Sequence, residues 1–386
     1  MRAGIRPARR SAGDDVTGIG VKALARGLGS EWLLAVSVAT CLAFALRGEA
    51  LFARLSEPIF LALIFAWLFG VILASALAVV RHADKVAEIL GEPYGTLVLT
   101  LAVTAIEVMS ISAVMLHGEN NPTLVRDTLF SIVMILLGLV IGSALLLGGF
   151  RHREQHYNLQ GANAYLGVII PLAVLTLTLA NFTTTTPGPT LSTPQQVFLL
   201  VVSCGLYVAF LAVQTGRHRG YFTEADEPAS HGHRATPSLA WHAALLVAYI
   251  LPVVFLAEQL AQPIDYLIET MRWPAALGGV VIAMLVATPE AIGAIRAATA
   301  NHLQRSINIT LGSVLSTTGL TVPAMLVISH TTDHEIYFGL SGANNVILLL
   351  TLAVSVVTFD SGRTNVLQGA VHVILFAAFL MLIVQD

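Results

Sequence analysis

The chain has 386 residues, of which 56% are hydrophobic and 11% charged, and its mean hydropathy is +0.78. Ordinary soluble domains have about 25% charged residues, so this composition is typical of a polytopic membrane protein. The formal net charge of −3 provides no basic field for nucleic acid. Two cysteines are too few for a disulfide framework or a thiolate metal cluster. We therefore expect a lipid bilayer around the chain and no nucleic-acid partner.

Residues 1–30 form a polar, basic and Gly-rich segment. The Arg9-Arg10 pair is followed by SAGDDV instead of the apolar stretch of a signal peptide, and no small-residue cleavage site is apparent. We interpret the segment as an uncleaved, disordered cytosolic tail.

Apolar stretches long enough to cross a bilayer, about 20 residues each, follow this tail. Spans are predicted at 31–46, 58–80, 92–116, 127–149, 163–182, 195–214, 239–260, 274–296, 305–328, 337–358 and 364–385. The first span and its outer loop, 31–57, precede two halves, 58–214 and 239–386, which a polar cytosolic loop at 215–238 separates. The fold class is thus an all-α polytopic membrane protein with about eleven transmembrane helices.

The distribution of basic residues indicates the orientation of these spans. With the N-terminus in the cytoplasm, sixteen of the twenty Lys and Arg residues lie on the cytoplasmic side. The other four are Arg47, Arg54, Arg126 and Arg272. Cytoplasmic loops carry the basic excess in membrane proteins, so we expect a cytoplasmic N-terminus and an outer C-terminus.

Glu107 and Glu290 are the two acidic residues that lie well inside predicted spans. An ionised acid there costs roughly 2.5–3.5 kcal/mol on insertion scales, so intramembrane acids are functional by default. The alternative is a buried acid retained for packing. No Lys or Arg lies deep in a span to serve as its counter-ion, which favours a functional role for both.

Each of the two acids is the last residue of a thirteen-residue segment, and the two segments are similar in sequence. GTLVLTLAVTAIE ends at Glu107 and GGVVIAMLVATPE ends at Glu290, with four identities in thirteen positions. The first segment runs outward and the second inward, so the pair predicts inverted-topology repeats, with cores at about 92–149 and 274–328. Transporters with such repeats bind their substrate near the membrane midplane at the repeat interface.

Residues near the acids are further candidate ligands. Pro289 removes a backbone donor and predicts a helix break before Glu290, which would free the carbonyl of Ala287 for a cation. Additional oxygen donors are expected from Thr104, Thr288, Ser143, Ser313 and Asn308. Small and hydroxyl residues are also ordinary helix-packing residues in membranes, and that reading stays open for the two serines.

A pair of carboxylates suits an exchanger of cations and protons. Hard cations such as Ca²⁺ prefer oxygen ligands, so Glu107 and Glu290 are the candidate metal ligands. Without a cation, two carboxylates in a dry site cannot both stay ionised, and the pair takes up protons. Such a site holds either a metal or protons, and it changes its exposure from one side of the membrane to the other only with difficulty when it is empty. These two properties produce antiport.

The segments VATPEAIGAIRAATANHLQRSINITLGSVLSTTGLTVPAM, GEPYGTLVLTLAVTAIEVM and LLLGGFRHREQHYNLQGANAYLGVIIPLAVLTL resemble the bacterial calcium/proton antiporters of the Cha type, in the cation/calcium exchanger superfamily. The resemblance implies an exchanger fold of ten core helices with one extra N-terminal span, in the bacterial inner membrane. It also implies exchange of cytosolic Ca²⁺, or in some relatives Na⁺ or K⁺, for external protons, without a cofactor. Its two repeat glutamates match Glu107 and Glu290.

Two features depart from that family. The 215–238 loop carries three acids rather than a long acidic run, so a calcium-sensing role for it is in doubt. MILLGLVIG lacks the asparagine that several relatives have there, which leaves the choice of ion less secure.

Other features of the sequence bear on alternative functions. A passive cation channel is an alternative function, although channels usually build filters from rings of subunits. No HExxH, GxSxG or Walker motif supports an enzyme. His218, His231 and His233 fit a solvated loop or a metal or pH site, and His372 fits helix packing or a proton relay.

Overall fold

The computed structural model describes residues 31–91, 94–116, 121–223 and 238–385. The predictions for the tail 1–30 and for His231 and His233 lie outside the described residues.

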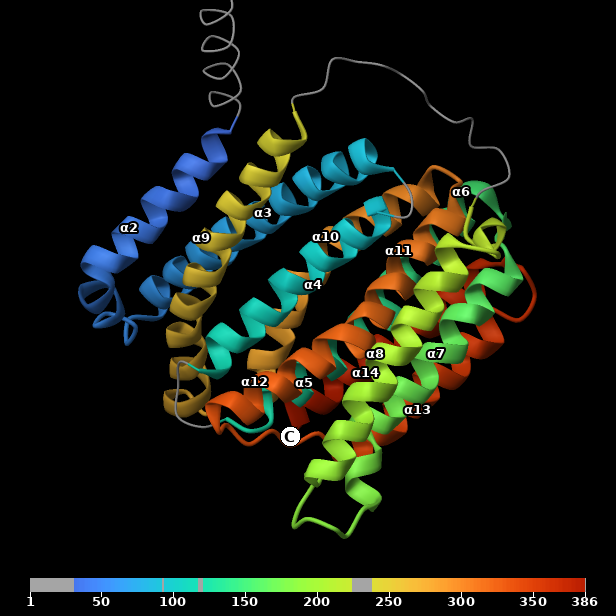
Figure 1. The fold of residues 1–386 in the computed structure, drawn as a ribbon. Coiled ribbons are helices and arrows are strands. Elements are labelled where there is room, and N and C mark those ends of the chain that lie inside the picture. Colours follow the sequence, from blue (N-terminus) through green and yellow to red (C-terminus); the bar gives the residue numbers. More distant parts are fainter. Residues whose placement is uncertain (1–30, 92–93, 117–120, 224–237, 386) are drawn as a thin grey trace, which may run out of the picture.

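Eleven helical rods make up the described chain, two of them divided by a π-helical segment (Figure 1). Ten are long and apolar enough to cross a membrane, and Gly342–Thr358 is shorter. The elements are α2 (Trp32–Phe52), α3 (Pro58–Leu90), α4 (Tyr94–Met115), α5 (Leu124–Met134), η1 (Ile135–Val140), α6 (Ile141–His152), α7 (Leu159–Leu177), η2 (Leu179–Phe182), α8 (Thr193–Thr215), η3 (Arg219–Tyr221), α9 (Leu239–Asp265), η4 (Tyr266–Thr270), α10 (Ala276–Thr299), α11 (Leu303–Ser316), η5 (Thr317–Thr321), α12 (Val322–Thr332), α13 (Gly342–Thr358) and α14 (Val366–Gln385). The predicted all-α polytopic architecture is confirmed.

Several of the predicted boundaries differ from the structure; for example, α3 ends at Leu90 rather than at residue 80. The first helix continues to Phe52 instead of ending at residue 46. The tenth rod begins at Gly342 rather than at residue 337. There the chain preceding the helix is extended, and its Tyr337 and Phe338 amides donate to the Pro122 and Pro189 carbonyls, 2.8 and 3.0 Å away. Apolar composition predicted a longer helix, but these tertiary hydrogen bonds hold the segment as a loop.

Several helices begin at recognisable local signals. Pro58 opens α3, where the missing amide hydrogen costs nothing. The Asn158 side chain accepts from the amides of Gln160 and Gly161 at the start of α7. Ser192 and Gln195 form a capping box at the start of α8.

The helices pack as two hydrophobic bodies. One cluster combines α2, α3 and α9 with Ile106 of α4 and Leu285 of α10. The second comprises the remaining helices and contains Ile111 of α4 and Ile282 of α10. In Figure 1, α2, α3 and α9 lie to one side, α7, α8, α13 and α14 to the other, and α4 and α10 between them. The two helices that carry the deep glutamates therefore contact both bodies.

The two repeat units share their construction. Each consists of a glutamate helix, α4 or α10, followed by a long rod that a π-helical segment interrupts. In the first repeat η1 divides α5 from α6, and in the second η5 divides α11 from α12. π-Segments are rare and occur frequently at functional sites. Inverted repeats of the exchanger type are thus present, as predicted.

A two-stranded ribbon joins the α6–α7 connection to the α13–α14 connection. β1 (Gln155–His156) pairs antiparallel with β2 (Arg363–Thr364), with Gln155 opposite Thr364. The Gln155 Nε2 also donates to the Ala298 carbonyl near the end of α10, at 2.8 Å. This ribbon was not predicted, because two-residue strands leave no periodic signal.

Candidate functional site

Glu107 lies in the interior of α4, where its side chain is 1% exposed. Its Oε2 atom accepts a hydrogen bond from the Thr317 Oγ1 of η5, 3.1 Å away. The Oε1 atom has no partner. The carboxyl group is thus held by one hydroxyl and retains capacity for a further ligand.

More hydroxyls lie around Glu107. Thr321, four residues beyond Thr317 on η5, lies near the same carboxyl without forming a hydrogen bond. On α4, Thr104 and Ser110 lie three residues before and after Glu107, both buried and both with unpaired hydroxyls. Residues three apart share a helix face. Buried hydroxyls normally find a partner, so this group of donors is suited to a ligand that brings its own contacts.

Glu290 lies in α10 and is buried, and neither of its carboxyl oxygens has a hydrogen-bond partner. The residue one turn before it is the buried Ala287, and Ala294, one turn after it, is fully buried as well. The environment along its own helix is therefore apolar, which makes the unpaired carboxyl costly unless it binds a cation or a proton.

The helix break predicted at Pro289 is wrong. α10 is continuous from Ala276 to Thr299 with Pro289 inside it. The Thr288 hydroxyl donates to the Met284 carbonyl of the same helix. The Thr288 hydroxyl, a predicted ligand, is therefore already hydrogen-bonded within its own helix.

The two carboxyl groups lie near each other. The charge of Glu290 acts electrostatically on Glu107. Thr317 is the single hydrogen-bond partner of the two carboxyl groups. No Lys or Arg side chain of the described residues is therefore bonded to either of them. The described residues also contain no group of three His, Cys, Asp or Glu suited to a metal. A cation here would rely on two carboxylates completed by hydroxyls, carbonyls or water.

The two π-segments differ in chemistry. η5 reads TTGLT and packs against α4, whereas η1 reads ILLGLV and packs against α10. Aligning Gly138 with Gly319 places Leu136 opposite Thr317 and Val140 opposite Thr321. Glu107 thus faces hydroxyls, while the corresponding positions near Glu290 are aliphatic.

The remaining predicted ligands are not hydrogen-bonded to the pair. Ser143 and Ser313 are half-buried, and neither bonds a carboxyl oxygen. The Asn308 amide is engaged elsewhere: its Nδ2 donates to the Phe222 carbonyl at 2.5 Å, and its Oδ1 accepts from Gln304 Nε2 at 2.9 Å. The first of these bonds attaches α11 to the segment that follows α8, and the second lies within α11.

Thr317, Thr321 and Ser110 were missed in the sequence. The signal was present, since STTGLT is a hydroxyl-rich stretch with threonines four apart inside an apolar span. That spacing puts both side chains on one helix face. Their partner could not be identified, because their helix is more than two hundred residues from Glu107 along the chain.

His372 is fully buried in α14, where its Nε2 lies 3.0 Å from the Thr358 hydroxyl of α13. This contact agrees with the helix-packing reading of His372.

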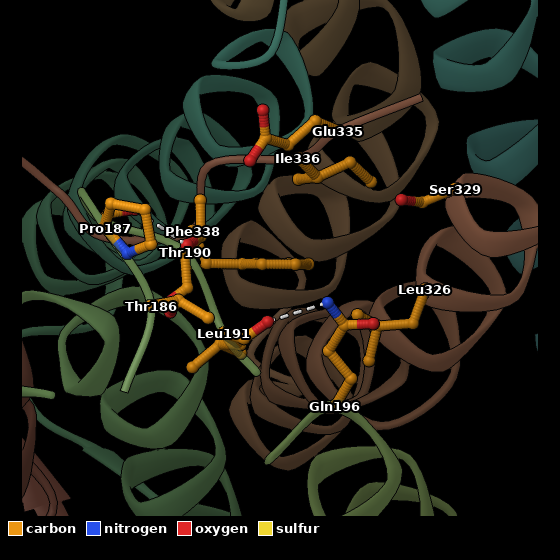
Figure 2. Close-up of a pocket in the computed structure, with 10 residues that line it drawn as sticks. All are labelled: Thr186, Pro187, Thr190, Leu191, Gln196, Leu326, Ser329, Glu335, Ile336 and Phe338. Carbon is orange, nitrogen blue, oxygen red and sulfur yellow. Dashed lines mark hydrogen bonds between the residues drawn. The ribbon is translucent and has the colours of Figure 1, made fainter. Parts of the chain in front are cut away.

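A separate cavity of about 170 Å³ lies among the connecting loops (Figure 2). Its wall includes the 186–191 loop, Gln196 of α8, Ser329 of α12 and the exposed Glu335. The Gln196 Nε2 donates to the Leu191 carbonyl across the wall, 2.8 Å away. None of the lining residues belongs to α4, α10 or η5, so this cavity is distinct from the carboxyl pair.

Comparison with known sequences relates the chain to cation exchangers. Residues 60–216 and 241–385 match the family described as sodium/calcium exchanger protein. The chain is 44% identical over 273 residues to the putative ionic transporter y4hA of Sinorhizobium fredii (strain NBRC 101917 / NGR234), covering 69% of this chain and 74% of that one. It is 40% identical over 276 residues to the sodium-potassium/proton antiporter ChaA of Escherichia coli (strain K12), covering 70% and 74%. To the Ca(2+)/H(+) antiporter ChaA of Bacillus subtilis (strain 168) it is 25% identical over 272 residues, covering 67% and 74%.

Solved structures share the fold. The native YfkE structure superposes with a TM-score of 0.69 at 18% identity, covering 92% of this chain and all of that one. The H+/Ca2+ exchanger CAX superposes with a TM-score of 0.60 at 15% identity, covering 91% and 88%.

Proposed function

This chain belongs to the sodium/calcium exchanger protein family, and we propose that it exchanges a metal cation for protons through a site built on Glu107 and Glu290. The resemblance to cation/calcium exchangers of the Cha type is confirmed by this membership and by the relatives. The chain is a multi-pass membrane protein.

One observation carries the proposal. Two buried carboxyl groups, on corresponding helices of the two repeats, act on each other electrostatically and have no basic partner among the described residues. A fully ionised, empty pair would be strongly unfavourable in such an environment. The pair therefore carries either a cation or protons whenever it is buried.

This exclusivity couples the two fluxes. A cation displaces the protons on one side of the membrane, and protons displace the cation on the other. The inverted repeats provide two related arrangements of the same helices around the site, which is the structural basis of alternating access in many transporters. No cofactor takes part, and the cargo consists of inorganic cations and protons.

We propose Ca²⁺ as the first cargo, moved out of the bacterial cytosol through the inner membrane in exchange for external protons. Two carboxylates would neutralise its charge. The hydroxyls of Thr317, Thr321, Thr104 and Ser110, with water, would complete the 6–8 oxygen ligands that Ca²⁺ takes. The Bacillus subtilis relative, named a Ca(2+)/H(+) antiporter, supports this candidate.

Exchange of Na⁺ or K⁺ for protons is the second candidate. It is favoured by the greater identity to the Escherichia coli sodium-potassium/proton antiporter. The aliphatic η1 also favours it, since few side-chain oxygens lie on the Glu290 side. A monovalent ion needs fewer negatively charged ligands than Ca²⁺ does.

Everted membrane vesicles, acidified inside by respiration and containing a fluorescent reporter of the pH gradient, test the proposal. We expect Ca²⁺ to collapse the gradient, and a response to Na⁺ or K⁺ instead would select the second candidate. A cation flux that never moves protons would favour a passive channel. No response to any of the three ions would contradict proton coupling.

Glu107→Gln and Glu290→Gln test the site itself. Each variant removes a ligand charge and a proton carrier, so exchange should fall to the level of vesicles without the protein while the folded protein is retained. Glu335→Gln, an exposed acid at the separate cavity, is the matched control and should keep wild-type exchange. Full activity of either variant of the pair would exclude the two-carboxylate mechanism.

A further inference from the structure

A second polar cluster, buried except for the exposed Arg81, lies at the end of the bundle where the described chain begins. It combines Glu31, which precedes α2, with Arg81 and His82 near the end of α3 and His242 and Tyr249 near the start of α9. Figure 1 shows these three helices side by side at one edge of the molecule. His82 is 2% exposed, His242 8% and Tyr249 fully buried. None of these residues takes part in the carboxyl site.

Glu31 is the acceptor at the centre of this cluster. Its Oε2 atom accepts from Arg81 Nη2 at 2.6 Å and from the Tyr249 hydroxyl at 2.8 Å. His82 Nε2 lies 3.5 Å from the same oxygen. Three helices are thereby joined through one carboxylate.

The two histidines contact each other directly. The Nδ1 atoms of His82 and His242 lie 2.9 Å apart, across the joint between α3 and α9. A hydrogen bond between them requires one Nδ1 with a proton and one without. If both rings are fully protonated, each Nδ1 carries a hydrogen, so the bond is lost and two cations face each other at that distance.

The other charges around the pair are unequal on its two sides. Glu31 faces His82 and favours a proton there, whereas Arg81 opposes one. Lys85, on the next turn of α3, acts on His242, whose Nε2 is buried without a partner. The pair can therefore share one added proton beside Glu31, but a second proton would have only the same carboxylate as counter-ion and would be opposed by Arg81 and Lys85.

We propose that the His82–His242 pair is a regulatory proton-binding site, separate from the transport site, which loosens the α3–α9 joint when the membrane face carrying Glu31 becomes acidic. Unperturbed histidine changes charge within the physiological range. Because the pair lies beside Glu31 at one end of the bundle, it responds to the pH on that face.

The joint is placed to act on transport. α3 and α9 both pack against α4 and against α10, the helices of Glu107 and Glu290. Separating their ends removes a constraint on both glutamate helices at once. The cluster also attaches α2, which precedes the family match beginning at residue 60. The effect on transport depends on the proposed exchange function, whereas proton binding by the pair does not.

The transport test varies the pH on each face separately in reconstituted vesicles and measures the maximal rate at saturating cation. Saturation removes simple competition between protons and cation at the carboxyl pair. We expect the wild-type rate to fall about fivefold when the Glu31 face is taken from about pH 8 to about pH 5.5. The double variant His82→Asn/His242→Asn keeps a side-chain hydrogen bond without a titrating ring, and its rate should change less than about twofold.

His330→Asn is the matched control, an exposed histidine of α12 at the other end of the bundle, and it should keep the wild-type profile. A double variant that transports with an unchanged wild-type pH profile would overturn the regulatory role.

Tryptophan fluorescence provides a readout that needs no transport. Trp241 precedes His242, and replacing Trp32, Trp67 and Trp273 by Phe leaves it as the single tryptophan. In a Glu290→Gln background, its emission should titrate with pH when the histidines are present and not in the double Asn variant. The same titration in both would overturn proton binding by the pair. If Trp241 emission titrates with pH but neither the wild type nor any variant transports a cation, proton binding by the pair is supported and the exchange function is refuted.

Discussion

Glu107 and Glu290 are buried deep inside membrane-spanning helices and have no hydrogen-bonded Lys or Arg among the described residues. Their neighbours were harder to identify. Thr128, Thr310 and Thr351 donate to the carbonyl four residues earlier, as threonines in helices commonly do. The sequence does not distinguish these from Thr317, whose hydroxyl bonds a carboxylate on another helix. The functional threonine is defined by its partner, which only the packing supplies.

Thr317→Val tests the role of this hydroxyl. Valine matches threonine in shape but leaves Glu107 Oε2 without its donor. Hydrogen bonds to charged groups contribute about 1.5–3 kcal/mol, so the KM for the cation should rise by about tenfold or more. The measurement is initial exchange rate against cation concentration in everted vesicles.

Thr317→Ser and Thr318→Val are the controls for this prediction. Serine retains the hydroxyl and should preserve the KM. The Thr318 hydroxyl donates to the Val314 carbonyl, 3.0 Å away, so its loss should leave the KM unchanged. An equal KM in Thr317→Val and wild type would exclude Thr317 from the site.

At the scale of the helix, close packing limits what α10 can carry. A Cβ added at Gly279 would lie 2.7 Å from the Asp127 carbonyl carbon and the Thr128 amide nitrogen of α5. Backbone atoms cannot yield as a flexible side chain does. This glycine therefore sets the contact between the Glu290 helix and the rod that contains η1.

Gly279→Ala should destabilise the protein by roughly 1–3 kcal/mol, the usual cost of overpacking. Gly70→Ala is the control, since nothing lies within 4 Å of its added Cβ. Thermal denaturation of both purified variants in detergent checks the prediction. Equal melting temperatures of Gly279→Ala and Gly70→Ala would show that α10 can move away from α5 without a loss of stability.

The anchoring of α2 through Glu31 predicts a pH dependence of stability. Burial disfavours the Glu31 carboxylate, but the hydroxyl of Tyr249 and the charges of Arg81 and His82 outweigh it and lower the pKa of Glu31 below 4.5. A carboxylate with a lowered pKa stabilises the fold above its unfolded pKa, and the stabilisation is lost as the pH falls through the folded value.

Glu31→Gln should therefore reduce the free energy of unfolding at neutral pH by roughly 1–3 kcal/mol. The difference from wild type should shrink below about pH 4.5. Melting temperatures across this range provide the measurement, with the exposed Glu88→Gln as a control that leaves them unchanged. A difference that stays constant down to the most acid pH would contradict the role of the ionised carboxylate.

For the whole molecule, eleven helical rods place the two ends of the described chain at opposite ends of the bundle, as Figure 1 shows. The basic residues of the sequence predict which end faces the cytoplasm. Thr184 in the α7–α8 loop and Arg217 after α8 are both exposed, and they lie at opposite ends of α8.

Single cysteines at these positions, with Cys41 and Cys204 replaced by serine, test the orientation. A membrane-impermeant thiol reagent should label Thr184→Cys in intact cells and Arg217→Cys only after the cells are opened. The reverse pattern would invert the proposed direction of exchange.

The sequence alone determined the membrane environment, the number of helical rods, the inverted repeats and the two buried glutamates. Each of these follows from hydropathy or from charge in an apolar segment, which are local properties with a large energetic cost. Tertiary structure decided three other features: the continuity of α10 through Pro289, the position of the η5 hydroxyls beside Glu107, and the histidine joint between α3 and α9. In each case a hydrogen bond or a packing contact selects among local alternatives of similar energy, and for η5 and the histidines the partners come from distant parts of the chain.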